Sequence, residues 1–228
     1  MIRNILFDLD ETLFDFKKAE QQALSKALTE VGVDLTEKIL ERYSEINLSQ
    51  WKLLENQVIT REQVKLHRFE LLFEEFSVSA DAAKTAERYE NLLGIGHYFM
   101  DGAQELLQQA YGKYRMYLVS NGTLSVQTGR LESAKIAPLF DGIFISEEVG
   151  ADKPSKVFFD HVFAHITDFH KEETVIVGDS LTSDIRGGNM AGITTIWSNL
   201  RGQNNPGDIH PDYEIHALKE LLPLIETL

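Results

Sequence analysis

The stretch Ile5-Leu6-Phe7-Asp8-Leu9-Asp10-Glu11-Thr12 decides how the chain folds. Its apolar residues predict a short buried strand, which ends in two aspartates that are two positions apart. At the C-terminal end of a strand in an open α/β sheet, this spacing directs both carboxylates into the crevice where such folds bind ligands. We therefore expect chemistry at Asp8 and Asp10, although aspartates that only stabilise a turn would give the same local pattern.

A helical block follows this strand. Apolar residues recur at helical spacing over residues 17–31 and 36–55, and again over 81–93. Another helix is expected to begin at Thr60, because Thr60-Arg61-Glu62-Gln63 has the pattern of a capping box. Four successive helices without a strand predict a separate all-α insertion, so we expect domains at 1–15 plus 97–228 and at 16–96.

From residue 101 the pattern alternates between helices and strands. Strands are predicted at 115–120, 142–146, 174–179 and 194–197, with a helix before or between each of them. This alternation is typical of a doubly wound parallel sheet with helices on both faces, so the fold class is α/β with a Rossmann-like core. The first strand joins this sheet, and residues 213–228 add a short edge strand and a closing helix.

Composition limits the partners. The 228 residues include 22 Lys plus Arg against 36 Asp plus Glu, a net charge of −14, so nucleic acid and anionic membranes would be repelled. A small phosphorylated substrate therefore needs local positive charge from a metal or a lysine. The absence of cysteine excludes disulfides and thiolate chemistry. With no apolar stretch of 18 residues and no signal sequence, we expect a cytoplasmic protein.

Polar groups also end the later strands of the predicted sheet. These are Ser120-Asn121-Gly122-Thr123, Lys153-Pro154 after the third strand, and Gly178-Asp179-Ser180 with Asp184 beyond it. Each has an ordinary explanation: a turn, a solvated lysine or a helix cap. Because all of them follow parallel strands at one edge of a sheet, their coincidence favours a functional site.

In order, Asp8-Leu9-Asp10-Glu11-Thr12 and the three later motifs resemble the four motifs of the haloacid dehalogenase-like (HAD) phosphohydrolases. The resemblance covers essentially the whole chain, and a helical insertion after the first motif resembles that family's helical cap. It implies a phosphomonoester hydrolase.

The residue types fit this chemistry. Asp8 would attack phosphorus to form an aspartyl-phosphate, and Asp10 would protonate the leaving oxygen and later deprotonate a water. Mg²⁺ suits an all-oxygen site with the carboxylates of Asp8 and Asp179, and the resemblance adds the backbone carbonyl of Asp10. Asp184 would support that site from behind or through a water. The phosphate would be held by Lys153, Ser120 and the backbone of Asn121.

A narrower resemblance concerns the helical insertion, where several positions look like the cytoplasmic pyrimidine-type 5′-nucleotidases that also act on noncanonical nucleotides. We expect Asn47, Trp51 and Arg68 to contact the leaving group, while the alternative is that Trp51 is core and that Asn47 and Arg68 form a solvated face. One departure is Gln57, where the resemblance leads us to expect glycine. The positions that carry it are Asn47, Trp51, Glu55-Asn56, Ile59-Thr60, His67-Arg68-Phe69 and Ser146-Glu147-Glu148-Val149-Gly150.

The leading hypothesis is a Mg²⁺-dependent nucleotidase that releases phosphate from nucleoside 5′-monophosphates. One alternative is a phosphatase or mutase acting on a sugar phosphate or another small phosphomonoester. Dehalogenation is disfavoured, because that metal-independent chemistry does not need Asp10 as a proton donor. A phospho-accepting signalling protein shares an acidic metal site and a lysine, but it does not explain the helical insertion or the length of the chain.

Overall fold

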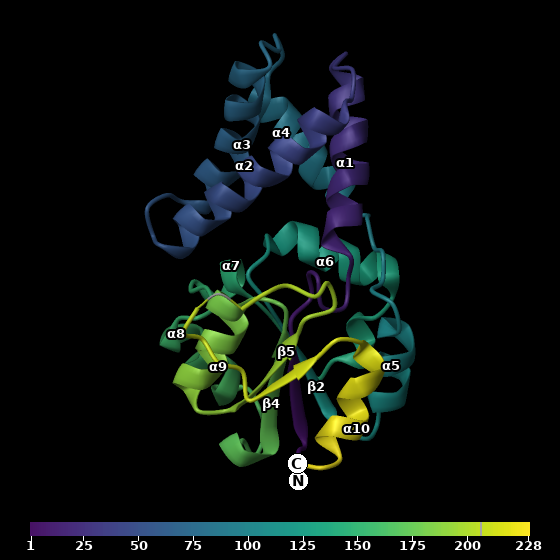
Figure 1. Ribbon diagram of the computed structural model, residues 1–228, viewed down its shortest axis with the longest axis vertical. Helices are drawn as coiled ribbons and strands as arrows, with labels where there is room; N and C mark the ends of the chain where they lie inside the picture. Colours follow the sequence, from purple (N-terminus) through teal and green to yellow (C-terminus); the bar gives the residue numbers. More distant parts are fainter. Residues whose placement is uncertain (206) are drawn as a thin grey trace. The chain divides into compact units, whose positions relative to one another are not determined.

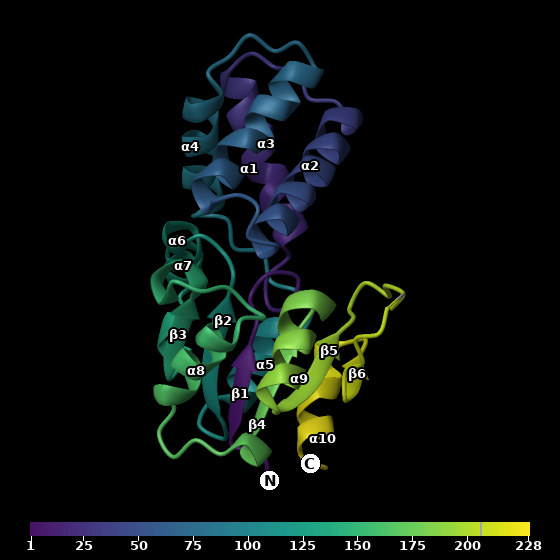
Figure 2. The same ribbon diagram turned by 90° about the vertical axis from the view of Figure 1, so that its left-hand side faces the viewer.

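The computed structural model describes residues 1–205 and 207–228 (Figures 1 and 2). The chain divides into two compact units, an α/β unit of Met1–Phe16 with His97–Leu228 and a helical unit of Lys17–Gly96. The predicted α/β fold class with a parallel sheet is confirmed. The two units are described separately below.

A single parallel sheet forms the centre of the α/β unit. Its order is β3-β2-β1-β4-β5-β6, and each neighbouring pair is parallel. The first strand therefore lies at the centre although residues 17–96 separate it from the rest of the unit. The strands are β1 (Asn4–Phe7), β2 (Arg115–Ser120), β3 (Gly142–Ile145), β4 (Thr174–Gly178), β5 (Thr194–Ser198) and β6 (Tyr213–Ile215).

The central strand is buried on both faces. Ile5 and Phe7 of β1 pack into one hydrophobic cluster, whereas Leu6 packs into another on the opposite face of the sheet. This alternation follows the two-residue period of a strand. A strand covered on both sides reads as a continuous apolar run, which is why Ile5-Leu6-Phe7 identified it.

Helices cover both faces of the sheet (Figure 2). They are α5 (Ala103–Ala110), α6 (Leu124–Ala134), α7 (Ser146–Val149), α8 (Lys156–Ala164), α9 (Arg186–Ala191) and α10 (Leu221–Ile225). The segment after β4, predicted as one helix, begins instead with a π-helical turn at Leu181–Ile185 before α9. There the side chain of Asp184 folds back to accept a hydrogen bond from the Ser180 backbone at 3.1 Å.

The helical unit consists of α1 (Phe16–Glu30), α2 (Glu37–Glu55), α3 (Arg61–Glu75) and α4 (Ala82–Leu93). The predicted capping box at the start of α3 is confirmed, with Thr60 Oγ1 accepting from the Gln63 backbone and Gln63 Oε1 accepting from the Thr60 backbone. Inside the unit, the ring of Tyr43 lies 5.3 Å from that of Phe69 and 5.6 Å from that of Tyr89. This aromatic cluster holds α2, α3 and α4 together.

Gln57 ends the turn after α2 in a left-handed backbone conformation, with φ of 58°. Glycine adopts this conformation without the steric cost that a β-carbon brings. The departure from the glycine expected here therefore leaves the turn formed, but with a residue that fits it less well.

Among the residues that the structure describes, no helix is long and apolar enough to cross a membrane.

Candidate active site

Asp8 and Lys153 meet at the C-terminal edge of the sheet, although 145 positions separate them in the sequence. Asp8 follows β1 directly, and its backbone N–H extends the strand pairing by donating to the Val177 carbonyl at 2.9 Å. The Lys153 ammonium donates to Asp8 Oδ1 at 2.7 Å, and both side chains are buried. The solvated lysine that the sequence left open as an alternative is thus excluded.

The Lys153 ammonium is fully engaged. Besides Asp8, it donates to Asp184 Oδ1 at 2.6 Å and to the Val119 carbonyl at 2.7 Å, and only 1% of the residue is exposed. Burial lowers the pKa of Lys153, but the carboxylates of Asp184 and Asp8 more than offset it, so the net pKa is raised above its usual range. Lys153 is therefore a permanent buried cation among carboxylates.

The Asp8 carboxyl has a pKa raised to about 7. Burial is the main cause, the Lys153 cation opposes it, and the carboxylates of Asp184 and Asp10 add to it. The pKa of Asp179 is also raised, first by burial and then by Asp8 and Asp184. Crowded carboxylates of this kind gain from a bound cation that neutralises them.

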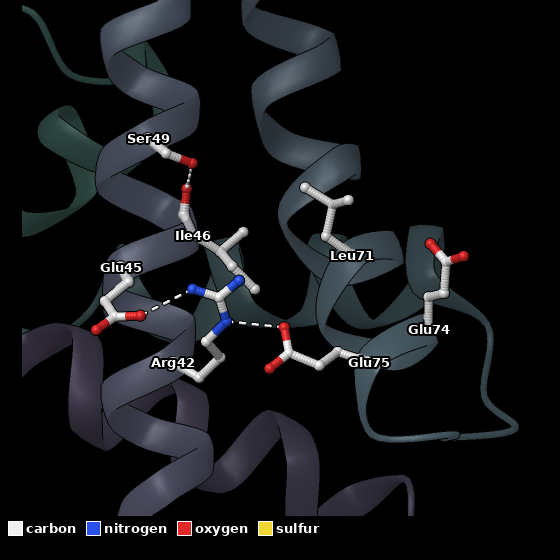
Figure 3. Close-up of a pocket in the computed structure, with 7 residues that line it drawn as sticks. All are labelled: Arg42, Glu45, Ile46, Ser49, Leu71, Glu74 and Glu75. Carbon is white, nitrogen blue, oxygen red and sulfur yellow. Dashed lines mark hydrogen bonds and ion pairs between the residues drawn. The ribbon is translucent and has the colours of Figure 1, made fainter.

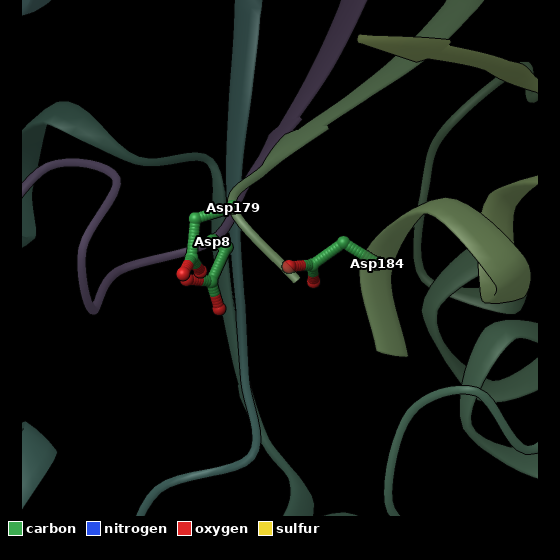
Figure 4. Close-up of side chains that lie close together, drawn as sticks. All are labelled: Asp8, Asp179 and Asp184. Atoms are coloured by element: carbon green, nitrogen blue, oxygen red, sulfur yellow. The ribbon is translucent and has the colours of Figure 1, made fainter. Parts of the chain in front are cut away.

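Asp8, Asp179 and Asp184 form one acidic cluster, shown in Figure 4. Each offers a carboxylate oxygen, and these oxygens lie within 4.8 Å of one another. Hard divalent cations prefer such oxygen ligands, so the cluster fits the metal that the sequence predicted. The cluster includes the side chain of Asp184, whereas the side chain of Asp10 lies outside it.

Gly178 permits this cluster. A β-carbon at Gly178 would lie 2.3 Å from the Asp184 carboxyl, which is closer than non-bonded atoms approach. The absence of a side chain at the end of β4 therefore lets Asp184 fold in toward Lys153.

Ser120 and Asn121 end β2 beside Lys153. The Asn121 side chain donates to the Lys153 carbonyl at 2.9 Å and accepts from the Lys153 N–H at 2.8 Å. Ser120 is buried, and its hydroxyl oxygen accepts from the Gly122 N–H at 3.2 Å. The Asn121 side chain thus braces the loop that carries the lysine, which leaves anion binding to the Ser120 hydroxyl and to backbone groups.

The geometry matches the order of motifs that the sequence suggested, and the comparison with known families agrees. The haloacid dehalogenase-like hydrolase family matches residues 5–198. The chain belongs to that family. The predicted membership, and with it the prediction of an enzyme, is confirmed.

Three relatives of this HAD hydrolase are informative. It is 38% identical over 223 residues to the pyrimidine 5′-nucleotidase PynA of Streptococcus pneumoniae, covering 97% of this chain and 94% of PynA. It is 32% identical over 221 residues to the pyrimidine 5′-nucleotidase YjjG of Escherichia coli, covering 97% and 96%. A crystal structure of the magnesium-bound HAD-hydrolase YfnB from Bacillus subtilis has 38% identity, a TM-score of 0.93 and 98% coverage of both chains.

Two residues of this HAD hydrolase that sequence reasoning missed hold Asp10. The Gln127 Nε2 group donates to Asp10 Oδ2 at 2.7 Å, and Arg130 Nη1 donates to Asp10 Oδ1. Both come from α6, and both are buried. A signal existed, because Gln127 and Arg130 lie beside Val126 and Leu131 on the apolar face of that helix, where polar residues are unusual.

The expected leaving-group contacts Asn47 and Arg68 lie inside the helical unit. Asn47 Nδ2 donates to Glu20 Oε1 at 2.7 Å, while Asn47 Oδ1 accepts from Arg68 Nη1 at 3.1 Å. Arg68, only 2% exposed, also donates to Glu90 Oε1 at 3.1 Å. Both side chains are buried, which excludes the solvated face, while the contact with the leaving group stays a prediction. Trp51 is partly exposed and donates to Asn47 Oδ1 at 3.1 Å.

A hollow between α2 and α3 is an alternative location for a ligand in the helical unit (Figure 3). Its lining arginine, Arg42, is already paired with Glu75 at 2.7 Å and Glu45 at 2.8 Å. Glu74 adds a further negative charge to the lining. A phosphate would be repelled there, so the cluster around Asp8 is the better candidate.

Proposed function

We propose that this HAD hydrolase removes phosphate from nucleoside 5′-monophosphates, preferring pyrimidine bases, with Mg²⁺ as cofactor and Asp8 as nucleophile. The observation that carries the proposal is the buried contact between Asp8 and Lys153 inside the carboxylate cluster. The names of PynA and YjjG support the nucleotide substrate, and the magnesium in the YfnB structure supports the metal.

In the first half of the reaction, an Asp8 oxygen attacks phosphorus and the bond to the nucleoside oxygen breaks. The Ser120 hydroxyl binds a phosphoryl oxygen. The buried Lys153 cation, whose N–H groups already donate within the site, offsets the charge of the phosphoryl group. Asp10 gives its proton to the leaving nucleoside oxygen. The products are the nucleoside and an aspartyl-phosphate on Asp8.

In the second half, Asp10 takes a proton from a water that attacks the phosphorus of the aspartyl-phosphate. The bond from phosphorus to Asp8 breaks, phosphate leaves and the Asp8 carboxylate is restored. Asp8, Asp179 and the backbone carbonyl of Asp10 would hold Mg²⁺. Asp184, whose oxygens accept from Lys153 and from the Ser180 N–H, would support the site from behind or through a water. When bound, Mg²⁺ supplies positive charge that allows a carboxylate to approach a phosphate dianion.

A substrate panel tests the proposal. Phosphate release would be measured from UMP, dUMP, dTMP, purine monophosphates, sugar phosphates and phosphoglycolate, each with Mg²⁺ and with EDTA. We expect metal-dependent turnover that is concentrated on the pyrimidine monophosphates. Release mainly from the sugar phosphates or phosphoglycolate would keep the Asp8 site and reject the nucleotidase, whereas release that EDTA does not affect would reject the metal.

The response of stability to pH should reveal the metal site independently of activity. Because the pKa values of Asp8 and Asp179 are raised on folding, the stability that these two groups contribute to the metal-free protein is fully present below their unfolded pKa values. That stability declines as the pH rises through about 7, where Asp8 ionises. Mg²⁺ binds the ionised carboxylates, so its stabilisation should be larger near pH 8 than near pH 5.5.

At about 100-fold excess over its dissociation constant, Mg²⁺ should raise the free energy of unfolding by about 2.7 kcal/mol near pH 8. Thermal unfolding at matched ionic strength measures this gain. Asp179→Asn should lose most of it, and Asp160→Asn, which alters an exposed ion pair with Lys156, should keep it. An equal gain at both pH values would show that Mg²⁺ does not bind these carboxylates.

Two expectations stay predictions: that the helical unit acts as a cap that reads the leaving group, and that the protein works in the cytoplasm.

A further inference from the structure

We propose that Gln127 and Arg130 are positioning residues that hold Asp10 as a proton acceptor for hydrolysis of the aspartyl-phosphate, and that Gln127 also orients the Ser120 hydroxyl. This inference rests on the proposed function. Neither residue belongs to the four motifs, and both act through other groups rather than on the substrate.

Packing holds the Arg130 side chain in place in addition to its contact with Asp10. The residue is fully buried, and its guanidinium carbon lies 5.1 Å from the ring centre of Phe14 and 5.8 Å from that of Phe16. A buried cation is costly unless it is paired, and the contact with Asp10 supplies the opposite charge. The same Nη1 group also donates to Gln127 Oε1 at 3.1 Å, so the two side chains form one unit.

The Gln127 side chain links Asp10 to Ser120 through two hydrogen bonds. Its Nε2 group carries two hydrogens, one directed to Asp10 Oδ2 at 2.7 Å and the other to Ser120 Oγ at 2.9 Å. Ser120 Oγ also accepts from the Gly122 N–H at 3.2 Å, so both of its lone pairs are engaged. The hydroxyl hydrogen is then left to donate, as binding a phosphate oxygen requires.

The turn before α6 allows this approach. A β-carbon at Gly122 would lie 2.4 Å from Gln127 Nε2, too close for any side chain to be accommodated there without displacing the amide. The glycine of the Ser120-Asn121-Gly122 motif therefore leaves the space that the Gln127 amide occupies.

Both oxygens of Asp10 accept a hydrogen bond in this arrangement, one from Arg130 and one from Gln127. The carboxylate is thus held in one orientation and presented as an acceptor. The Asp10 side chain remains 29% exposed, which leaves room for a water to approach. This geometry suits the second half of the reaction, when Asp10 takes a proton from the attacking water.

With an aryl phosphate as substrate, the two halves of the reaction can be measured separately, because its leaving group departs without help from a proton donor. For the Arg130→Met variant with Mg²⁺, we expect a burst in which each chain releases one molecule of the phenol product. The rate of this burst should be near that of the parent protein. The steady rate after the burst should fall about 10²-fold, and intact mass should show the aspartyl-phosphate accumulating. Arg130→Lys should recover part of the steady rate.

Gln127→Leu is the second variant, and it keeps the Arg130 cation. It should slow the steady phase as well, and it should also weaken inhibition by inorganic phosphate several-fold, because the Ser120 hydroxyl loses its orientation. Ser133→Ala, on the same helix, is the control and should keep the parent rates in both phases.

A burst and a steady rate that fall together, or that both stay at the parent value, would overturn the positioning role. Phosphate inhibition that does not change in Gln127→Leu would overturn the part that concerns Ser120. If the parent protein showed no Mg²⁺-dependent turnover of any phosphomonoester, the proposed function itself would have failed, which is a distinct result.

Discussion

Replacing Asp8 by asparagine is expected to reduce phosphate release by at least about 10⁴-fold, because an amide oxygen cannot form the aspartyl-phosphate. The side chains have nearly the same shape, and the asparagine oxygen can still accept the hydrogen bond from Lys153 that Asp8 Oδ1 accepts at 2.7 Å. Phosphate release from a nucleoside monophosphate, together with intact mass after brief exposure to substrate, measures both turnover and the covalent intermediate.

The same variant should remain folded. Burial raises the pKa of Asp8 to about 7, so above that pH the ionised carboxylate costs folding free energy that a neutral amide does not. Without metal near pH 8, Asp8→Asn should therefore unfold at the parent temperature or above it. Activity at the parent level in Asp8→Asn would show that the nucleophile is another group, and Asp160→Asn controls for loss of a surface carboxylate.

The second large effect is expected for Lys153→Met, which removes the buried cation and keeps its apolar length. Asp8 and Asp184 would then face each other without compensation, and breaking a buried pair in this way costs about 3–5 kcal/mol. Phosphate release should also fall about 10²–10³-fold, because the phosphoryl group loses a preorganised positive charge. Chemical denaturation and phosphate release with saturating Mg²⁺ measure the two effects.

The loss of stability in Lys153→Met should be smaller near pH 5 than near pH 8. At the lower pH the carboxyl of Asp8, whose pKa is raised, takes up a proton and no longer needs a partner. Lys156→Met is the matched control, since that lysine is exposed and pairs with Asp160 one turn along α8, where an ion pair contributes little. Equal effects of the two substitutions would contradict the role of Lys153 as the cation of the site.

The sequence by itself determined the sheet and the residues at its edge. Apolar runs mark β1 and β4, and the end of a parallel strand is a fixed place in this fold, so Asp8 and Asp179 could be assigned to one edge. The capping box at Thr60 was also readable, because its hydrogen bonds join residues only three positions apart. Local patterns were sufficient wherever the structure that they specify is local or periodic.

Only the tertiary structure decided which side chains serve these groups. Gln127 and Arg130 reach Asp10 across 117 and 120 positions, and which face of α6 turns toward β1 depends on the packing of the whole unit. In the same way Asn47 and Arg68, 21 positions apart, use each other as partners inside the helical unit instead of pointing outward. The sequence does not show which partner a polar helix residue has, because its burial and pairing depend on the elements that pack against it.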